Sequence, residues 1–186
     1  YEGANTSFQV HLRAAPDEFA ATHNAAQAAT AVVLAISGNS PLFLGRRLWD
    51  ETRIALFRQS VDERVGASDG DWRPARVSFG HGWVRRGAVE LFEESAHLHE
   101  PLLPVCAGED PLAVLRLGAA PSLAELRLHH GTVWRWNRAV YDHTGGGHFR
   151  VEMRALPAGP TVTDMAANAA FLVGLTLGLR EEIDLF

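Results

Sequence analysis

The chain contains no lysine, and all 17 of its Lys-or-Arg positions are arginine. A Walker-type phosphate loop and a Schiff-base enzyme both need a lysine, so this chain can supply neither. Its single cysteine, Cys106, cannot form a disulfide within the chain. A lone cysteine fits a reducing compartment but leaves the location open, and we expect a cytoplasmic protein.

The chain also lacks a long basic tract, a signal peptide and an uninterrupted apolar run long enough to cross a bilayer. With a formal net charge of −5, nothing favours a nucleic-acid partner, and we expect no membrane partner either. The 186 residues are 47% hydrophobic, with no internal repeat and no low-complexity linker. This composition predicts a single α+β domain with a sizeable core over residues 1–186.

Two segments far apart in the chain, residues 7–13 and 149–155, alternate strictly between apolar and polar side chains. A period of two predicts a half-buried strand, because successive side chains leave a strand on opposite faces. The polar faces of these two strands carry the side-chain types that hold metal ions and phosphates. They are Gln9, His11, Arg13, Arg150, Glu152 and Arg154.

Helical signals fill much of the remaining chain. An alanine-rich helix is predicted from the Pro16 start signal to residue 36, and another at 161–179 with Thr161 or Thr163 as its N-cap. Shorter helices are predicted at 88–97 and 122–130, and a short helix or irregular segment at 50–60. Strands are predicted at 74–83 and 132–137, and turns at 37–41, 69–71 and 145–147.

Five segments, in order, resemble motifs of the glutamate–cysteine ligases and related carboxylate–amine ligases. They are residues 6–13, the Asn39-Ser40-Pro41 turn within 35–43, residues 50–53, residues 61–64, and the Glu152-x-Arg154 strand at 151–155. Five features in the right order are more specific than any one of them. The resemblance covers most of the chain and is weakest over residues 66–130.

The resemblance implies a glutamine synthetase-like fold: a curved, mostly antiparallel sheet with helices packed on one face and the active site on a face of the sheet. It implies that ATP and two or three Mg²⁺ ions bind there. The γ-carboxylate of glutamate would attack ATP to give an acyl phosphate. An amine, cysteine in glutathione biosynthesis, would then displace phosphate and form the amide.

The resemblance also implies roles for particular residues. Glu152 and His11 would ligate magnesium, and Gln9, which replaces an acid or histidine of many relatives, would offer only a neutral oxygen. Arg154 lies two residues from Glu152 on the same face, where its planar guanidinium would hold the transferring phosphoryl group.

Other arginines are candidates for the substrates. Arg53, and with less support Arg64, would bind the substrate carboxylate, while Arg135 and Arg138 could reach nucleotide or substrate. Each has a plainer reading as an ion-pair partner, Arg53 and Arg64 with neighbouring aspartates and the strand residues with charges across the sheet. Asn39 is expected to fix its turn rather than touch ligand.

Both ends look like cuts in a longer protein, so we expect the C-terminal part of a catalytic domain, with the remainder of the parent chain as its partner. The relatives take further acidic metal ligands from strands earlier in the domain, so the segment alone need not be active. A non-catalytic or regulatory module of the same fold is one alternative. A ligase for another acid or amine is the other. The expected partners are small molecules, ATP and amino acids, and the oligomeric state stays open.

Overall fold

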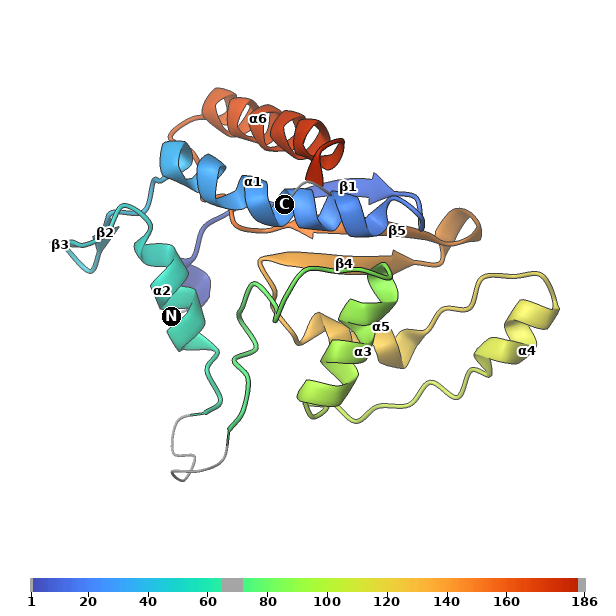
Figure 1. The fold of residues 1–186 in the computed structure, drawn as a ribbon. Coiled ribbons are helices and arrows are strands. Elements are labelled where there is room, and N and C mark those ends of the chain that lie inside the picture. Colours follow the sequence, from blue (N-terminus) through green and yellow to red (C-terminus); the bar gives the residue numbers. More distant parts are fainter. Residues whose placement is uncertain (1, 65–71, 184–186) are drawn as a thin grey trace.

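A three-stranded antiparallel sheet forms the centre of the computed structural model, which describes residues 2–64 and 72–183. The strands are β1 (Val10–Ala14), β5 (His148–Met153) and β4 (Asn137–Asp142), in the order β1-β5-β4 (Figure 1). His11 pairs with Glu152, which pairs in turn with Arg138, so the two segments that alternate in the sequence are neighbouring strands. The turn predicted at 69–71 lies outside the described residues.

Two long helices cover one face of this sheet. They are α1 (Phe19–Ser37) and α6 (Val162–Arg180), which pack along each other (Figure 1). The apolar side chains that alternate along the strands, such as Val151 and Met153, are buried against Phe19 and Leu172 of these helices. The α+β class, the antiparallel sheet and the helices on one face are therefore as predicted, while the likeness to glutamine synthetase stays a prediction.

The remaining elements lie around the edges of the sheet. The hairpin β2 (Leu42–Phe43) and β3 (Arg46–Arg47) precedes α2 (Thr52–Ser60), and α3 (Ala88–Leu98) packs with α5 (Ala124–Gly131) beside β4. A short helix, α4 (Pro111–Arg116), lies on the long connection between α3 and α5. Two 3₁₀ turns complete the order, η1 (Glu2–Ala4) and η2 (Thr144–Gly146).

Two strand predictions were wrong. Residues 74–83 are irregular and contribute only one isolated bridge, between Ser78 and Arg135. Gly80 has a φ of +90°, a conformation that interrupts a ladder of strand hydrogen bonds. The strand predicted at 132–137 begins only at Asn137, because the preceding Trp136 is buried with Phe57 of α2 in a second apolar cluster.

The predicted helices are present, and α6 begins as expected: the Thr161 side chain accepts a hydrogen bond from the Asp164 amide at 3.2 Å. By length and composition, α1 and α6 each suffice to span a membrane, which corrects the expectation that no stretch is long enough. This is weak evidence, since buried core helices meet the same criterion. Nearly half of α1 is buried in the protein, whereas most of α6 is exposed.

Two histidines in the interior make stability depend on pH. Burial lowers the pKa of His23 in α1 to about 4 and that of His130 in α5 to about 3. Both are neutral in the folded chain at neutral pH, and His23 Nε2 lies 3.3 Å from the Asn137 carbonyl oxygen. An unfolded histidine has a pKa of about 6.5, so the unfolded chain binds more protons as the pH falls below that value.

We therefore expect the free energy of unfolding to be constant above about pH 7 and to fall as the pH drops from about 6.5 towards 4. His23 alone would contribute a loss of about 3 kcal/mol over that range. Urea unfolding between pH 4 and 8 measures this slope. His23→Gln should flatten it, whereas His97→Gln, at an exposed position, should leave it unchanged. An equal slope in native protein and His23→Gln would contradict the assignment.

Candidate active site

The face of the sheet opposite α1 gathers polar and charged side chains. Because side chains alternate along a strand, the register places them in rows across β1, β5 and β4. The central row is His11, Glu152 and Arg138. The next row contains Arg13 and Arg150, and the row at the β4–β5 turn contains His148 and Asp142. The chain beyond the strand ends adds Gln9 and Arg154 on the other side of the central row.

Glu152 is the centre of this face and is almost fully buried, with 3% of its surface exposed. Arg138 Nε donates to its Oε2 at 2.6 Å, and Arg154 Nε lies 3.7 Å from the same oxygen. His11 Nε2 lies 3.5 Å from Oε1. With its amide turned to satisfy both neighbours, Gln9 donates to Oε1 at 2.7 Å and accepts from Arg154 Nε at 3.2 Å. One carboxylate thus holds two arginines, a histidine and an amide in a single network.

The charge on this face is mainly positive. Arg13, Arg138, Arg150 and Arg154 face two carboxylates, Glu152 and Asp142, and Asp142 already pairs with Arg150 at 3.3 Å. Burial lowers the pKa of His11, and the neighbouring arginines lower it further against the opposing effect of Glu152. His11 is therefore neutral at neutral pH, and the face suits an anionic ligand.

A small cavity of about 170 Å³ opens beside Gln9 and Arg154. Arg53 of α2 lines it from the other side, with Trp136 beneath its guanidinium at 5.4 Å. Arg53 is buried, donates to the Ala155 carbonyl oxygen, and lies 3.5 Å from Glu51. That distance joins Arg53 Nε to Glu51 Oε2, and the Nε makes no closer hydrogen bond, so the buried guanidinium is only loosely paired beside this cavity.

The turn before α2 sets the position of Arg53. The Asn39 side chain donates to the Ala158 carbonyl oxygen at 2.8 Å, and Glu51 accepts from the Asn39 amide at 3.0 Å. Ser40 Oγ accepts from the Arg53 amide at 3.2 Å. The Asn39-Ser40-Pro41 turn therefore fastens the start of α2 to the chain that follows β5, and Asn39 fixes the turn as expected.

Comparison with protein-family models shows which group of proteins this chain belongs to. The model of glutamate–cysteine ligase family 2 matches residues 4–183, nearly the whole chain. The chain belongs to this family. Ligase activity in the general sense of that family follows from the match, and the resemblance inferred from the five motifs is confirmed. No curated protein and no solved structure gives a significant match.

In this glutamate–cysteine ligase family member, most of the site residues predicted from the sequence lie close together on the polar face of the sheet. Gln9, His11, Arg138, Glu152 and Arg154 form the Glu152 network, and Arg53 reaches its edge through the small cavity. The strict alternation of residues 7–13 and 149–155 was the signal that found Gln9, His11, Glu152 and Arg154, whereas Arg53 came from the family resemblance and Arg138 was a candidate beside it.

Two predicted site residues lie elsewhere. Arg135 is 1% exposed and pairs with Glu94 of α3 at 2.6 Å, because it precedes the strand and points away from the polar face. Arg64 forms a two-contact pair with its neighbour Asp62, with Arg64 Nη2 2.6 Å from Asp62 Oδ2. Arg64 is therefore an ion-pair partner of Asp62, the alternative that the sequence also offered. For Arg53 the paired acid is Glu51 rather than Asp50.

Four further residues of the face were not named as site residues from the sequence: Arg13, Asp142, His148 and Arg150. Arg13 and Arg150 stand in the same alternating patterns as the residues that were named. Asp142 could not be found this way, because the strand β4 that brings it to this face was placed several residues too early, and His148 lies one residue before the strand predicted from residue 149.

The residues of this face do not form a ready-made magnesium site. Both oxygens of Glu152 are engaged by cationic or amide groups, and Asp142 is paired with Arg150. Magnesium prefers carboxylate, phosphate and water oxygens, whereas His11 and the Gln9 amide are weak alternatives. Within residues 2–64 and 72–183, no group of three His, Cys, Asp or Glu side chains is placed to hold a metal ion.

Proposed function

We propose that this chain is part of an ATP- and Mg²⁺-dependent carboxylate–amine ligase that joins glutamate to cysteine through an acyl phosphate. Family membership supports the reaction class. The observation that carries the proposal on the molecule is the Glu152 network, which presents arginines on one sheet face beside a small cavity. These are the groups needed to hold a carboxylate next to a phosphoryl group.

The small cavity is proposed to receive the carboxylate substrate. Its volume of about 170 Å³ suits an amino acid better than a nucleotide. Arg53 offers a buried guanidinium whose Nε is held only by the 3.5 Å pair with Glu51, and Arg154 lines the same cavity. A carboxylate bound between two arginines would exchange its water shell for charge-assisted hydrogen bonds, which are about twice as strong as neutral ones.

The phosphoryl group would lie next to it, over the central row. Arg154 borders both the cavity and Glu152, so it can contact the carboxylate and the phosphate at once. Arg138 is fixed by Glu152 at 2.6 Å and supplies a second positive charge. Because these guanidinium groups are held before the substrates arrive, little reorganisation is required as charge develops on the phosphoryl oxygens.

The reaction then consists of two displacements. A carboxylate oxygen of glutamate attacks the terminal phosphorus, and the bond from that phosphorus to the bridging oxygen breaks as ADP leaves. The amine nitrogen attacks the acyl carbon, the carbon–oxygen bond to phosphate breaks, and the amine releases a proton. The arginines would hold the two anions together against their repulsion and stabilise the charge on the transferred group.

Magnesium enters this proposal only with the nucleotide. Bound to the phosphates, the ion would neutralise part of their charge. Its ligands would be phosphate and water oxygens, since the carboxylates of this face are already paired. The cytoplasmic location and the place in glutathione biosynthesis belong to the same proposal.

We expect the protein as it is naturally produced to release phosphate from ATP only when both glutamate and an amine are present. Arg53→Lys should raise the KM for glutamate about tenfold or more, because lysine cannot reproduce the planar fork of donors. Arg58→Lys, at an exposed position of the same helix, should leave the KM unchanged. A coupled phosphate-release assay with varied glutamate measures both.

The assay also separates the alternatives. Release that requires an amine but prefers another acid over glutamate would replace the substrate and keep the reaction. Absence of release with every acid and amine, while ATP still binds, would indicate a non-catalytic binding module and overturn the proposal. An unchanged glutamate KM in Arg53→Lys would remove Arg53 from the substrate cavity.

A further inference from the structure

The hairpin between α1 and α2 exposes a cluster of large apolar side chains. Its strands β2 and β3 are joined by Leu44 and Gly45, and the hairpin projects from the body of the molecule (Figure 1). Leu44 at the turn is 80% exposed and Trp49 at the base is 70% exposed, and Leu42 and Leu48 are exposed as well. Apolar side chains that lie so close together on a protein surface are typical of a site that binds another molecule.

The turn of this hairpin holds a leucine in an unfavourable conformation. Leu44 has a φ of +48° and Gly45 has a φ of +76°. Glycine and asparagine suit such a turn, whereas a leucine is strained there. Leu44 also packs in neither of the two apolar cores. Because neither the turn nor a core accounts for a leucine at this position, a contact outside the chain explains it best.

Two arginines give the same hairpin a positive charge. Arg46 and Arg47 form β3 and are both exposed. In the part of the chain that the structure describes, neither guanidinium has an ion-pair or hydrogen-bond partner. Of the two acids that follow the hairpin, Asp50 is exposed, and Glu51 accepts hydrogen bonds from the turn before the hairpin. The exposed apolar residues and these arginines together form the hairpin surface: Leu42, Leu44, Arg46, Arg47, Leu48 and Trp49.

The base of the hairpin is fixed to the body of the chain. The Leu48 amide donates to the Pro41 carbonyl oxygen at 2.7 Å. The Ser40 amide donates to the Asp50 carbonyl oxygen at 2.8 Å. The hairpin surface is therefore held in place before a partner arrives, and little ordering is required on binding.

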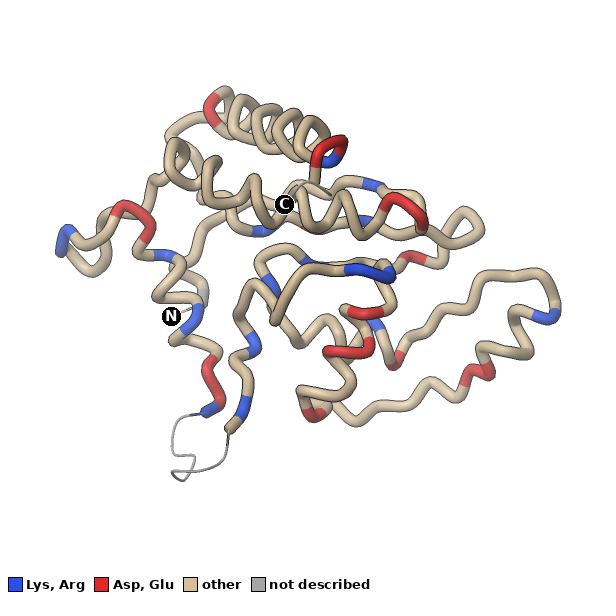
Figure 2. The backbone as a smooth tube through the Cα atoms, in the orientation of Figure 1, with Lys and Arg blue, Asp and Glu red and all other residues tan. Residues whose placement is uncertain are grey.

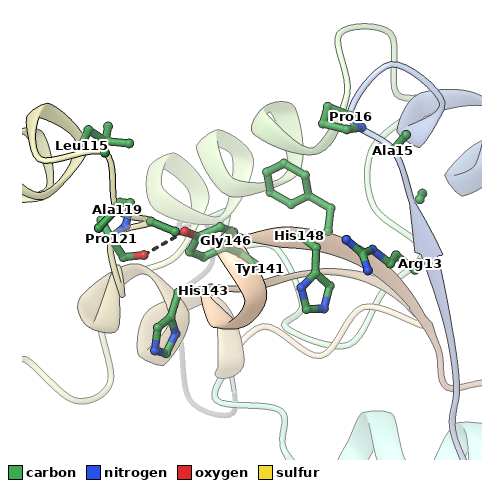
Figure 3. A pocket seen from close by; sticks show the side chains of 15 residues that line it. Arg13, Ala15, Pro16, Leu115, Ala119, Pro121, Tyr141, His143, Gly146 and His148 are labelled. Atoms are coloured by element: carbon green, nitrogen blue, oxygen red, sulfur yellow. Dashed lines mark hydrogen bonds between the residues drawn. The ribbon is translucent and has the colours of Figure 1, made fainter.

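The charge of the hairpin surface fits an anionic lipid surface better than a second copy of the chain. Figure 2 shows basic positions at the outer end of the hairpin. Both cavities of the sheet face would oppose it with the same sign of charge. The small one contains Arg53 and Arg154. The other, of about 1,090 Å³ beside the β4–β5 turn, contains Arg13, His143 and His148 (Figure 3). A bilayer needs no matching hollow for a projecting turn, and its anionic headgroups complement the arginines.

The order of side chains along the hairpin also matches the layers of a bilayer interface. Leu44 at the turn would reach the boundary of the acyl chains, where burial of apolar surface is favourable. Arg46 and Arg47 would lie among the phosphates, and Trp49 at the headgroup level that tryptophan prefers. An apolar group and a basic group together give a stronger attachment than either alone.

We propose that the hairpin surface attaches this chain to an anionic membrane surface. Such attachment is peripheral and needs no spanning segment, so the sequence prediction of no membrane partner, which rested on the lack of one, does not exclude it. Residues 44–49 lie between the family motifs at 35–43 and 50–53, and neither motif assigns them a role. The inference is independent of the proposed ligase reaction.

Sedimentation with lipid vesicles tests the inference on the protein as it is naturally produced. Vesicles of phosphatidylcholine and phosphatidylglycerol at a three-to-one ratio should bind the protein, and phosphatidylcholine alone should bind it about tenfold more weakly or less. Leu44→Asp and the double variant Arg46→Gln/Arg47→Gln should each weaken binding to the anionic vesicles about tenfold or more. All three positions are exposed, so the urea midpoint of these variants should equal that of the native protein.

Two control variants make the same kinds of change away from the hairpin. Leu117→Asp places an acid at another exposed leucine. Arg58→Gln/Arg116→Gln removes two other exposed arginines and changes the net charge equally. Because charges and apolar groups distant from the bilayer contribute little, both controls should bind within about twofold of the native protein.

Tryptophan fluorescence locates the contact. Trp49 is one of five tryptophans in the chain. Vesicles with brominated acyl chains should quench part of the emission, and this quenching should disappear in Trp49→Phe. Unchanged quenching in Trp49→Phe would place the contact elsewhere and overturn the inference.

The binding results can overturn it in three further ways. Equal binding by the native protein, Leu44→Asp and the arginine double variant would show that the hairpin surface makes no contact with lipid. Absence of binding to either vesicle would remove the membrane as the partner. A dimer that forms without lipid and dissociates in Leu44→Asp would assign the hairpin surface to a second copy of the chain. None of these measurements depends on phosphate release, so the ligase proposal stands or fails separately.

Discussion

Removal of the Glu152 carboxylate is expected to be the most damaging single change to this chain. Glu152→Ala leaves Arg138 and Arg154 without the buried acid that balances them, and it opens a hole in the central row of the sheet. Breaking one partner of a buried ion pair costs about 3–5 kcal/mol. We expect a loss of that size in the free energy of unfolding, measured by urea denaturation, together with loss of phosphate release.

An exposed ion pair provides the control. Glu93 pairs with Arg86 at 2.6 Å at the surface, and exposed pairs contribute about 0–1 kcal/mol, so Glu93→Ala should scarcely change stability. Combining Glu152→Leu with Arg138→Met should recover much of the stability lost in Glu152→Leu alone, because the second change removes the uncompensated charge. If Glu152→Ala is as stable as Glu93→Ala, the network around Glu152 does not hold this face together.

Glu152→Gln tests whether the carboxylate positions the arginines or ligates magnesium, because it keeps the shape of the side chain and removes its charge. If Glu152 acts by positioning Arg138 and Arg154, raising the magnesium concentration will not restore the activity of Glu152→Gln. Recovery at high magnesium would instead indicate that the carboxylate ligates the ion directly, against the paired arrangement found here.

The second large effect is expected at Arg154. Its guanidinium contacts Glu152 and Gln9 and borders the small cavity, so it is the group best placed to bear on the transferred phosphoryl group. Losing one fixed donor to developing charge typically costs about 10²–10³ in kcat. We expect Arg154→Met to lose that much, and Arg154→Lys to lose somewhat less, because lysine keeps the charge but not the two-donor geometry.

Single-turnover phosphate release separates this effect from substrate binding. Arg154→Lys should lower kcat more than it raises the KM for either substrate, whereas Arg53→Lys should act mainly on the glutamate KM. Arg180→Lys, which changes a surface pair with Glu18 and Glu181, should match the native enzyme. If Arg154→Lys raised a KM and left kcat unchanged, Arg154 would act in substrate binding. The proposed contact between Arg154 and the transferred phosphoryl group would then be wrong.

The positions of the arginines along the backbone show what distinguishes the group around Arg154 from the others (Figure 2). Arginines are spread over most of the chain, and many lie at turns and helix ends (Figure 2). Arg138 and Arg150 instead come from neighbouring strands and Arg154 from the chain just after β5, and all three lie on one face with Arg13 and Glu152. It is this concentration on a common face, with few acids to balance it, that favours binding of anions.

Sequence reasoning found the main site residues because period-two alternation is local. Once residues 7–13 and 149–155 are strands, Gln9, His11, Glu152 and Arg154 must lie on the polar faces of those strands. The family motifs added that the two strands belong to one site, and the register of His11 with Glu152 agrees. The same rule failed at residues 132–137, which were predicted to be a strand: Trp134 and Trp136 pack with Phe57 in a separate core, and the strand begins only at Asn137.

What the sequence determined by itself is therefore the set of side chains that the strands β1 and β5 present, the two long helices, the Thr161 cap of α6, and membership of the ligase family. The tertiary structure alone decided which strands are neighbours and in which register. It also decided that Arg135 is buried with Glu94 while Arg138 reaches Glu152, and that a large basic cavity forms between the β4–β5 turn and the segment after α4. Alternation is set by the geometry of one strand, whereas pairing, burial and cavities depend on contacts between residues of different elements, which no local pattern encodes.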